Sequence, residues 1–254
     1  MTALEALLVL VAGVWAGAIN TVVGSGSLVT FPVLLAVGYP PLTANVSNSL
    51  GLVPGSVSGA FGYRRELRGQ RDRLARLAPA SGIGGVVGAV LLLALPASAF
   101  EAIVPVFVAS GLVLVVLQPR INRWLAQRRA QGEHGHPHGG AAALGAAGLT
   151  GVYGGYFGAA QGIMLLALLG IAIDDDLQRL NALKVVLAGL VNFVAAVVFV
   201  LAAHLAWGAV GLIALGSALG GQLGARIGRR LPAPALRAVI VVVGLAAIAK
   251  LLLD

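Results

Sequence analysis

Four long stretches of this chain carry almost no charge, and they constrain its fold more than any other feature. Each contains at most one Asp, Glu, Lys, Arg or His: Ala3–Gly62, Leu77–Leu117, Ala141–Ile173 and Val185–Ala225. A bilayer crossing needs about 20 apolar residues, so each stretch is long enough for at least one. Only 10% of all residues are charged, against about 25% in soluble domains. The sequence therefore predicts an all-α polytopic membrane protein.

The basic residues predict how the chain lies in the bilayer. Thirteen of the 17 lysine and arginine residues fall in three connections, within 64–76, 118–140 and 226–230. The net charge of +8 could suggest nucleic acid, but basic residues confined to loops between apolar spans follow the positive-inside rule. We expect no nucleic-acid partner. We expect these three loops in the cytoplasm and both termini outside.

The residues of enzymes and metal sites are largely missing from the sequence. There is no cysteine, so thiolate chemistry and disulfides are excluded. HExxH and GxSxG motifs are absent, and the central segments contain no pair of acids, which argues against an intramembrane enzyme. Histidines 134, 136 and 138 could bind metal, but a flexible solvated linker is the simpler interpretation. We expect no cofactor, no metal and no catalytic residue.

Two interruptions divide apolar runs at matching places. The first break is Gly24–Ser27, with sequence GSGS, and the second break is Gly158–Gly162, with sequence GAAQG. Irregular backbone at membrane depth is tolerated only inside protein or beside a water-filled cavity. A pair of interrupted segments in the two halves of a chain indicates the binding site of a transporter.

The two halves also match each other as weak internal repeats. Residues 17–32 align with residues 151–166 without a gap, so that Gly24 meets Gly158. We predict a first repeat over 1–117, a cytoplasmic linker over 118–140 and a second repeat over 141–254. Each repeat is expected to be an interrupted helical hairpin followed by three transmembrane helices, about eight spans in total. Counting crossings between the basic loops makes the repeats inverted, with the hairpins either re-entrant or fully spanning.

Three local signals concern helix ends. Thr43 is a plausible N-cap for the helix that follows Pro40-Pro41. Pro54-Gly55 predicts a kink in that helix. Asp174–Asp176 precede a long apolar helix, and we expect them to cap it rather than to hold calcium, because three adjacent acids do not alternate as calcium ligands do.

Lys184 is the main candidate for binding a substrate. It lies one turn inside a long apolar helix, where a lysine costs about 2.5–3.5 kcal/mol on insertion scales. Either its ammonium group faces an anionic substrate, or the side chain extends to the membrane interface and keeps the ammonium group in water. Asn181 and Asn192 lie on its face of the helix. In the first half, Asn45, Asn48 and Ser49 occupy comparable turns. These polar groups could instead hydrogen-bond neighbouring helices.

The breaks offer a second means of holding an anion. Each is followed by a short helix, whose unpaired N–H groups and dipole favour negative charge. Side chains at the breaks add hydrogen-bond donors. The predicted substrate-binding residues are Asn20, Thr21, Gly24, Ser25, Gly26, Ser27, Asn48, Ser49, Tyr153, Gly158, Gln161, Gly162, Asn181, Lys184 and Asn192.

Several of these segments resemble motifs of a known family. Residues 18–32, with the run from Asn20 to Pro32, resemble the first-repeat signature of the TauE/SafE sulfite-exporter (TSUP) family. Gly151–Gly158 is similar to the second-repeat signature. Three further motifs follow the family's order along the chain: Ala44–Leu50, Asn181–Lys184 with Asn192, and Gly224–Gly228.

The resemblance implies a bacterial inner-membrane permease of small anions such as sulfite, sulfoacetate or related organosulfur compounds. Two positions depart from the family pattern: Ser49 stands where a lysine is frequent, and the second glycine cluster is diluted to Ala159-Ala160-Gln161. The leading hypothesis is a secondary transporter in the lipid bilayer. The alternatives are an anion channel of the same fold and a transporter of another small carboxylate or organic anion. Coupling to protons, and a monomeric or homodimeric state, are left open.

Overall fold

The structure is a computed structural model that describes residues 1–130, 139–227 and 233–253. In these ranges the protein is helical and contains no strand, which confirms the predicted all-α fold. The helices are α1 (Ala3–Val22), α2 (Ser27–Ala36), α3 (Pro41–Gly51), α4 (Val53–Gly62), α5 (Arg71–Ala94), α6 (Ala97–Ala130), α7 (Gly140–Tyr156), α8 (Gln161–Ala172), α9 (Leu177–Ala202), α10 (Trp207–Ile227) and α11 (Ala233–Leu253).

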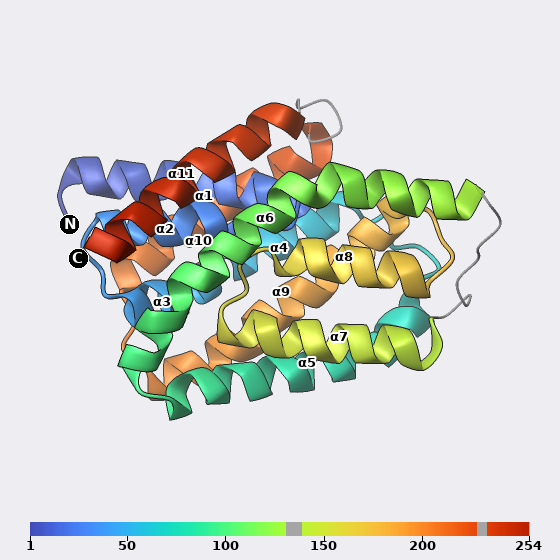
Figure 1. The fold of residues 1–254 in the computed structure, drawn as a ribbon, viewed down its shortest axis with the longest axis horizontal. Helices are drawn as coiled ribbons and strands as arrows, with labels where there is room; N and C mark the ends of the chain where they lie inside the picture. Colours follow the sequence, from blue (N-terminus) through green and yellow to red (C-terminus); the bar gives the residue numbers. More distant parts are fainter. Residues whose placement is uncertain (131–138, 228–232, 254) are drawn as a thin grey trace.

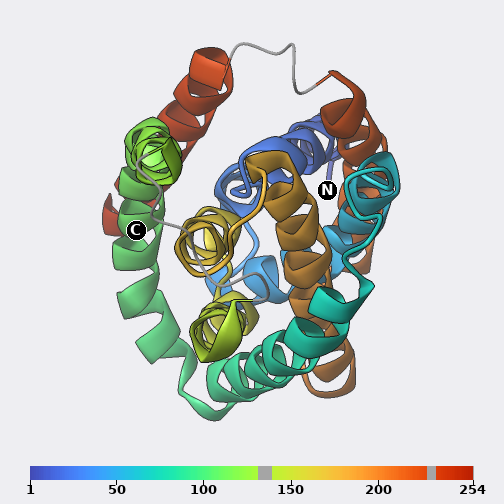
Figure 2. The same ribbon diagram turned by 90° about the vertical axis from the view of Figure 1, so that its right-hand side faces the viewer.

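Most helices run along the long axis of the molecule (Figure 1). Within the described ranges, α1, α5, α6, α9 and α10 are long and apolar enough to cross a membrane, whereas α2 and α8 are shorter apolar helices. These lengths confirm a polytopic membrane protein. Figure 2 looks along the bundle, where α8 and α9 lie between α6 on one side and α4 and α10 on the other.

The two interrupted hairpins enter the bundle from opposite ends (Figure 1). From the end that holds Met1, α1 runs inward and α2 returns to the same end. At the other end α7 begins, and α8 returns there. The second end also receives the α4–α5 connection and the C-terminal ends of α6 and α10, and we call it the arginine-rich end.

Helix boundaries follow from recognisable caps. Thr2 and Glu5 form a capping box at the start of α1. Asp176 accepts a 2.8 Å hydrogen bond from the Gln178 backbone N–H, so the predicted cap of α9 is confirmed. The Thr43 cap is wrong, since α3 already begins at Pro41, where the missing N–H of proline is no loss. The predicted kink occurs at Leu52, between α3 and α4.

Three predicted loops are shorter than expected, because the helices continue through polar residues. Helix α6 runs on to Ala130, so residues 118–130 of the predicted linker are helical. Helix α5 begins at Arg71, inside the predicted loop 64–76, and α10 ends at Ile227, beyond Arg226. Arginine, glutamine and alanine are good helix formers, so a helix does not stop where the apolar run stops. Residues 131–138, with the three linker histidines, and 228–232 lie outside the described ranges.

Glycine lets the helices of each hairpin approach their neighbours closely. A Cβ on Gly17 of α1 would lie 2.3 Å from the Ser217 carbonyl oxygen of α10. A Cβ on Gly88 of α5 would lie 2.0 Å from the Val152 carbonyl oxygen of α7. Such small-residue contacts drive helix association in lipid. They hold α1 and α7 in place, and thereby the two breaks that follow them.

Candidate functional site

The two breaks touch each other near the centre of the bundle. The Gly162 N–H donates a 3.0 Å hydrogen bond to the Gly24 carbonyl. A Cβ on Gly24 would lie 2.7 Å from the Gly162 Cα, and Gly24 also has φ +93°. Both the backbone conformation and the contact therefore require glycine. Sequence reasoning had predicted both breaks, and the structure places them in direct contact.

Donors from other helices cap the C-terminal end of α1. The Lys184 Nζ atom lies 3.1 Å from the Asn20 carbonyl oxygen and 3.5 Å from that of Thr21. The Asn181 amide donates to the Thr21 carbonyl at 3.2 Å, and the Gln118 amide donates to the Val23 carbonyl at 3.4 Å. The last carbonyls of a helix have no partner within it, and cations are favoured there. Helices α6 and α9 thus complete the end of α1.

Lys184 is deeply buried, and only 1% of its surface is exposed. The alternative that it extends to the membrane interface is therefore wrong. Its ammonium group is held by backbone carbonyls, and the carbon stem lies against Gly162, where an added Cβ would be 3.0 Å from the lysine Cδ. One side chain therefore contacts both the end of α1, just before the first break, and the second break itself.

The second break is held in a similar manner by the first half of the chain. The Asn45 amide on α3 donates a 3.0 Å hydrogen bond to the carbonyl of Tyr156, the last residue of α7. The Tyr153 hydroxyl donates to the Ala159 carbonyl at 2.6 Å, within the break itself. Asn45 and Asn181 thus play corresponding parts: each caps the interrupted helix of the other half.

Asn45 and Gln118 were absent from the predicted set. A usable signal existed for Asn45, since it precedes Asn48 by three residues, as Asn181 precedes Lys184. The sequence offered no such signal for Gln118, because this residue lies just beyond the apolar stretch that ends at Leu117. Its position became clear only when α6 proved to continue to Ala130.

Three other predicted residues form contacts within the first half. Asn48 accepts a hydrogen bond from the Thr30 hydroxyl, and its amide donates to the Ser27 hydroxyl oxygen at 3.1 Å. Asn48 therefore fixes the start of α2. Ser49 donates to the Asn45 carbonyl at 3.0 Å, a local bond along α3. Asn192 is buried on α9 but does not line the cavity beside Lys184.

Several buried polar atoms around the breaks have no hydrogen-bond partner. At the first break this is the Ser25 Oγ atom, and at the second it is the Gln161 Nε2 atom. The Gln161 side chain lies against Gly154, where an added Cβ would be 2.3–2.4 Å from its amide group. Buried polar groups without partners are rare and call for a water, an ion or a ligand.

The cavity at the contact between the breaks is small, about 10 Å³. It is lined by Asn20, Thr21, Gly24, Ser56, Gly162, Lys184, Val185 and Ala188. This volume is close to the minimum that admits one water molecule. The structure therefore brings five predicted residues together, Asn20, Thr21, Gly24, Gly162 and Lys184, in a closed arrangement.

A larger polar cavity adjoins the end of α1 on the side of the arginine-rich end. It has a volume of about 160 Å³ and is lined by Val22, Tyr63, Gln118, Asn122, Leu166, Leu177, Gln178 and Asn181. Four of these eight side chains are amides. We call this space the polar cavity.

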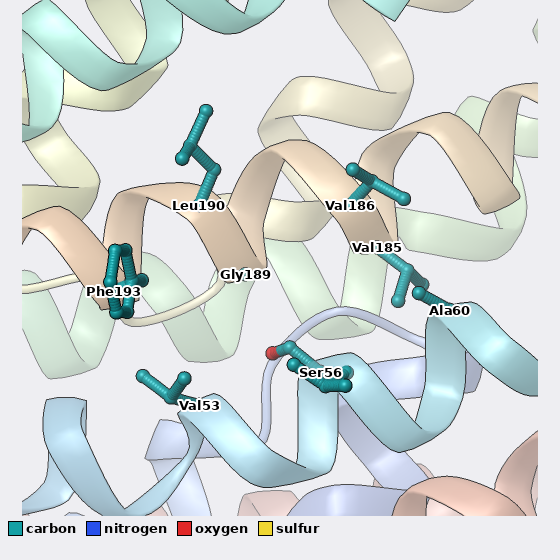
Figure 3. A pocket seen from close by; sticks show the side chains of 9 residues that line it. Val53, Ser56, Ala60, Val185, Val186, Gly189, Leu190 and Phe193 are labelled. Atoms are coloured by element: carbon teal, nitrogen blue, oxygen red, sulfur yellow. The ribbon is translucent and has the colours of Figure 1, made fainter. Parts of the chain in front are cut away.

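A third space is an apolar groove of about 260 Å³ between α4 and α9. Figure 3 shows Val53, Ser56 and Ala60 on α4 facing Val185, Gly189 and Phe193 on α9, with the Ser56 hydroxyl as the single side-chain oxygen drawn. Val57 and Phe193 are 65% and 52% exposed at its edges. In a bilayer this groove faces hydrocarbon.

Aromatic rings fill the bundle on the other side of the breaks. Phe31 of α2 and Phe157 have ring centroids 5.2 Å apart, and Phe107 of α6 stacks on Phe157 at 5.8 Å. Phe100 and Tyr156 extend the cluster, with a centroid distance of 5.9 Å. The rings of Phe31, Phe100, Tyr156 and Phe157 are buried in the hydrophobic core.

This architecture defines the class of protein. Discontinuous membrane helices that meet in the middle of a bundle, next to buried polar side chains, are the arrangement of secondary transporters. Comparison with known sequences then identifies the family: "Sulfite exporter TauE/SafE" matches residues 9–251, and the chain belongs to this family. It is accordingly a multi-pass membrane transporter and not an enzyme.

Curated relatives carry consistent names. The "Probable membrane transporter protein YfcA" of Escherichia coli (strain K12) is 28% identical over 240 residues, which cover 94% of this chain and 86% of the relative. The "Probable membrane transporter protein ORF9" of Sinorhizobium sp is 30% identical over 112 residues, covering 44% of this chain and 43% of the relative. No solved structure shows a significant match.

Proposed function

We propose that this protein is a secondary transporter of small anions, with sulfite or an organosulfonate such as sulfoacetate as substrate. The observation that carries the proposal is the contact between Gly24 and Gly162 beside Lys184. Two short helices, α2 and α8, begin at this contact, and the only lysine or arginine lining the cavity there is Lys184.

The groups around the contact have the chemistry that an anion requires. Because a helix dipole is positive at its N-terminal end, the starts of α2 and α8 favour negative charge. The Ser25 hydroxyl and the Gln161 amide have polar atoms without partners, and both can donate to an oxyanion. No carboxylate lines the cavity. A positive group, two helix N-termini and two free donors together favour an anion over a cation.

The small volume of the central cavity requires movement during transport. A cavity of about 10 Å³ holds no more than about one water molecule, so an anion enters only when the breaks move apart. Lys184 and Asn181 then release the carbonyls of α1 and donate hydrogen bonds to the substrate. We propose that this separation is the alternating-access step.

Two features support inverted repeats as the basis of that step. The α1–α2 and α7–α8 hairpins enter from opposite ends (Figure 1). Asn181 caps α1 and Asn45 caps α7, so each half holds the interrupted helix of the other. In an inverted pair of this kind the two halves can exchange their arrangements, so that the site opens to the other side of the membrane.

Uptake by the purified protein in liposomes tests the proposal. Lys184→Met keeps a long unbranched side chain, one atom shorter than lysine, and removes its charge, so we expect uptake of radiolabelled sulfoacetate to fall at least tenfold. The matched control is Lys250→Met on α11, the only other lysine in the chain, which should transport normally. Unchanged uptake by a well-folded Lys184→Met protein would contradict the proposed site.

The same liposomes separate a transporter from a channel and reveal the driving ion. A transporter saturates with substrate concentration, and coupling to protons makes an imposed pH gradient accumulate sulfoacetate above its external concentration. Non-saturating flux that only dissipates a gradient would favour a channel. If sulfoacetate and sulfite are both inert while a small carboxylate is taken up, the substrate class is wrong and the site assignment stands.

A further inference from the structure

We propose that the polar cavity is the route by which the anion reaches the two breaks, and that Asn122 and Gln178 are its first contacts on that route. The inference rests on the proposed function, because it supplies the entrance to the same site. The polar cavity has room for a small anion, with about 160 Å³ against about 10 Å³ for the cavity at the contact between the breaks.

The lining of the polar cavity suits a solvated anion. Amide side chains from α6 and α9 face the cavity, and each offers N–H donors to an oxyanion. These four are Gln118, Asn122, Gln178 and Asn181. No aspartate or glutamate is among the lining residues, so an entering anion meets no like charge.

The inner end of the polar cavity is connected directly to Lys184. Asn181 lines the cavity and donates to the Thr21 carbonyl, which also receives the Lys184 ammonium group. Gln118 lines the cavity as well and donates to the Val23 carbonyl, next to Gly24. One layer of hydrogen bonds therefore separates the cavity from the contact between the breaks.

Two buried atoms indicate that this layer is completed by a ligand or by water. Gln118 and Asn181 are 4% and 6% exposed, and the amide oxygen of each has no hydrogen-bond partner. A small anion brings water into the cavity, and rotation of either amide would present its N–H groups instead. Both residues can thus pass the anion from the cavity to Lys184.

Other paths to the breaks are unfavourable in the described part of the chain. The apolar groove (Figure 3) faces hydrocarbon, and its one hydroxyl, on Ser56, already donates to the Leu52 carbonyl. An unpaired charge in such surroundings is very costly. Around Phe157 the rings of Phe31 and Phe107 pack closely and offer an anion no hydrogen-bond donor. By contrast, Arg64, Arg65 and Arg68 are exposed at the arginine-rich end, where positive charge raises the local concentration of anions.

Because the native chain has no cysteine, one introduced thiol reports on this route without background. We expect Asn122→Cys and Gln178→Cys, in the purified full-length protein, to react with a polar methanethiosulfonate reagent. Saturating sulfoacetate should slow the reaction at least fivefold; sulfoacetate is used because sulfite itself attacks such reagents. After labelling with a bulky reagent, uptake in liposomes should fall at least tenfold.

Two variants serve as controls. Gln127→Cys lies one to two turns beyond Asn122 on the same helix, is exposed and does not line the cavity, so it should react without protection and without loss of uptake. Asn192 is buried, so Asn192→Cys should stay unlabelled.

If the two cavity thiols do not react, the route is elsewhere. The same follows if sulfoacetate leaves their reaction rates unchanged while uptake persists. Absence of sulfoacetate uptake in every variant and in the native protein would instead count against the proposed function.

Discussion

Lys184 shows how a charged side chain can be buried in a membrane protein with no carboxylate partner among the described residues. Its insertion costs about 2.5–3.5 kcal/mol on insertion scales, and carbonyls at the end of α1 compensate by accepting its hydrogen bonds. The negative end of the helix dipole adds to this stabilisation. The charge is thereby held ready for an anion while no anion is bound.

The contact between the breaks leads to a prediction about two glycines. Gly24→Ala places a Cβ 2.7 Å from the Gly162 Cα at φ +93°, whereas Gly38→Ala, at φ +95°, meets no atom within 4 Å. The strain of a left-handed conformation is about 1–2 kcal/mol in both variants, and the clash adds to it only at Gly24. We therefore expect a clearly larger fall in melting temperature for Gly24→Ala in detergent.

Equal melting temperatures for the two variants would mean that the breaks do not touch in solution. Gly38→Ala serves as the matched control, because it tests the backbone strain without the contact. The comparison is independent of transport and of the identity of the substrate.

At this scale the sequence predicted the unusual residues but not their partners. The breaks, Lys184 and Asn181 stand out because small or polar residues are rare in apolar runs. Their partners are mostly backbone carbonyls, as with Asn20 and Thr21, and every residue has a carbonyl. No sequence pattern could therefore indicate which of them Lys184 and Asn181 would reach.

Among the elements, the connection between α8 and α9 joins the two halves at the arginine-rich end. Asp175 accepts hydrogen bonds from Arg73 of α5 and from Arg179 of α9 at 2.9 Å. The Gln70 amide donates to the Arg179 carbonyl and to the Glu66 carbonyl, both at 2.9 Å. The start of α9, which carries Asn181 and Lys184, is anchored by this network.

Asp175 makes the network sensitive to pH. Burial raises the pKa of its carboxyl group, but hydrogen bonds from Arg73, Arg179 and the Asp176 backbone, with the charge of Arg179, outweigh burial and leave the pKa below its usual value. A lowered pKa stabilises the fold above the unfolded value of about 3.9, and this stabilisation is lost as pH falls through the folded value.

We expect the melting temperature of the native protein to decline below about pH 4, as the carboxyl of Asp175 takes up a proton. Asp175→Asn should melt lower than the native protein at pH 7, and the difference between the two should shrink as the pH falls. A difference that stays constant from pH 7 to pH 3 would show that the carboxylate does not stabilise this end of the bundle.

The helices themselves were mostly predictable, and their ends less so. Hydrophobic length identified the spans, and the Asp176 cap could be predicted from local sequence. Hydropathy cannot predict where a helix ends once it has left the membrane. For this reason the predicted spans missed the extensions of α5, α6 and α10 into arginine-containing segments. The early start of α3 was missed because Thr43 was given more weight than Pro41.

For the whole molecule, the arrangement of the connections predicts an orientation. The exposed residue Arg68 lies in the α4–α5 connection at the arginine-rich end, and exposed Ser98 lies near the α5–α6 turn at the other end. The positive-inside rule places the first in the cytoplasm and the second outside. The inverted relation of the two halves, which was also derived from the positive-inside rule, stays a prediction.

Single cysteines at these two sites test the orientation. An impermeant thiol reagent should label Ser98→Cys in spheroplasts and Arg68→Cys in inverted membrane vesicles, with little reaction in the reverse combinations. The opposite pattern would place the arginine-rich end outside and would turn the proposed entrance into an external one. Labelling of both sites from one side would contradict the course of α5 across the bilayer.

The hydrogen bond between the breaks is made by main-chain atoms alone, from the Gly162 N–H to the Gly24 carbonyl. Amino-acid replacement around it can alter the lining of both cavities without altering the donor or the acceptor. Substrate selectivity and the contact between the breaks are in this sense encoded separately: the first in side chains that can be exchanged, the second in the main chain of two glycines. The substrate preference of such a protein can change while the contact between the breaks is kept.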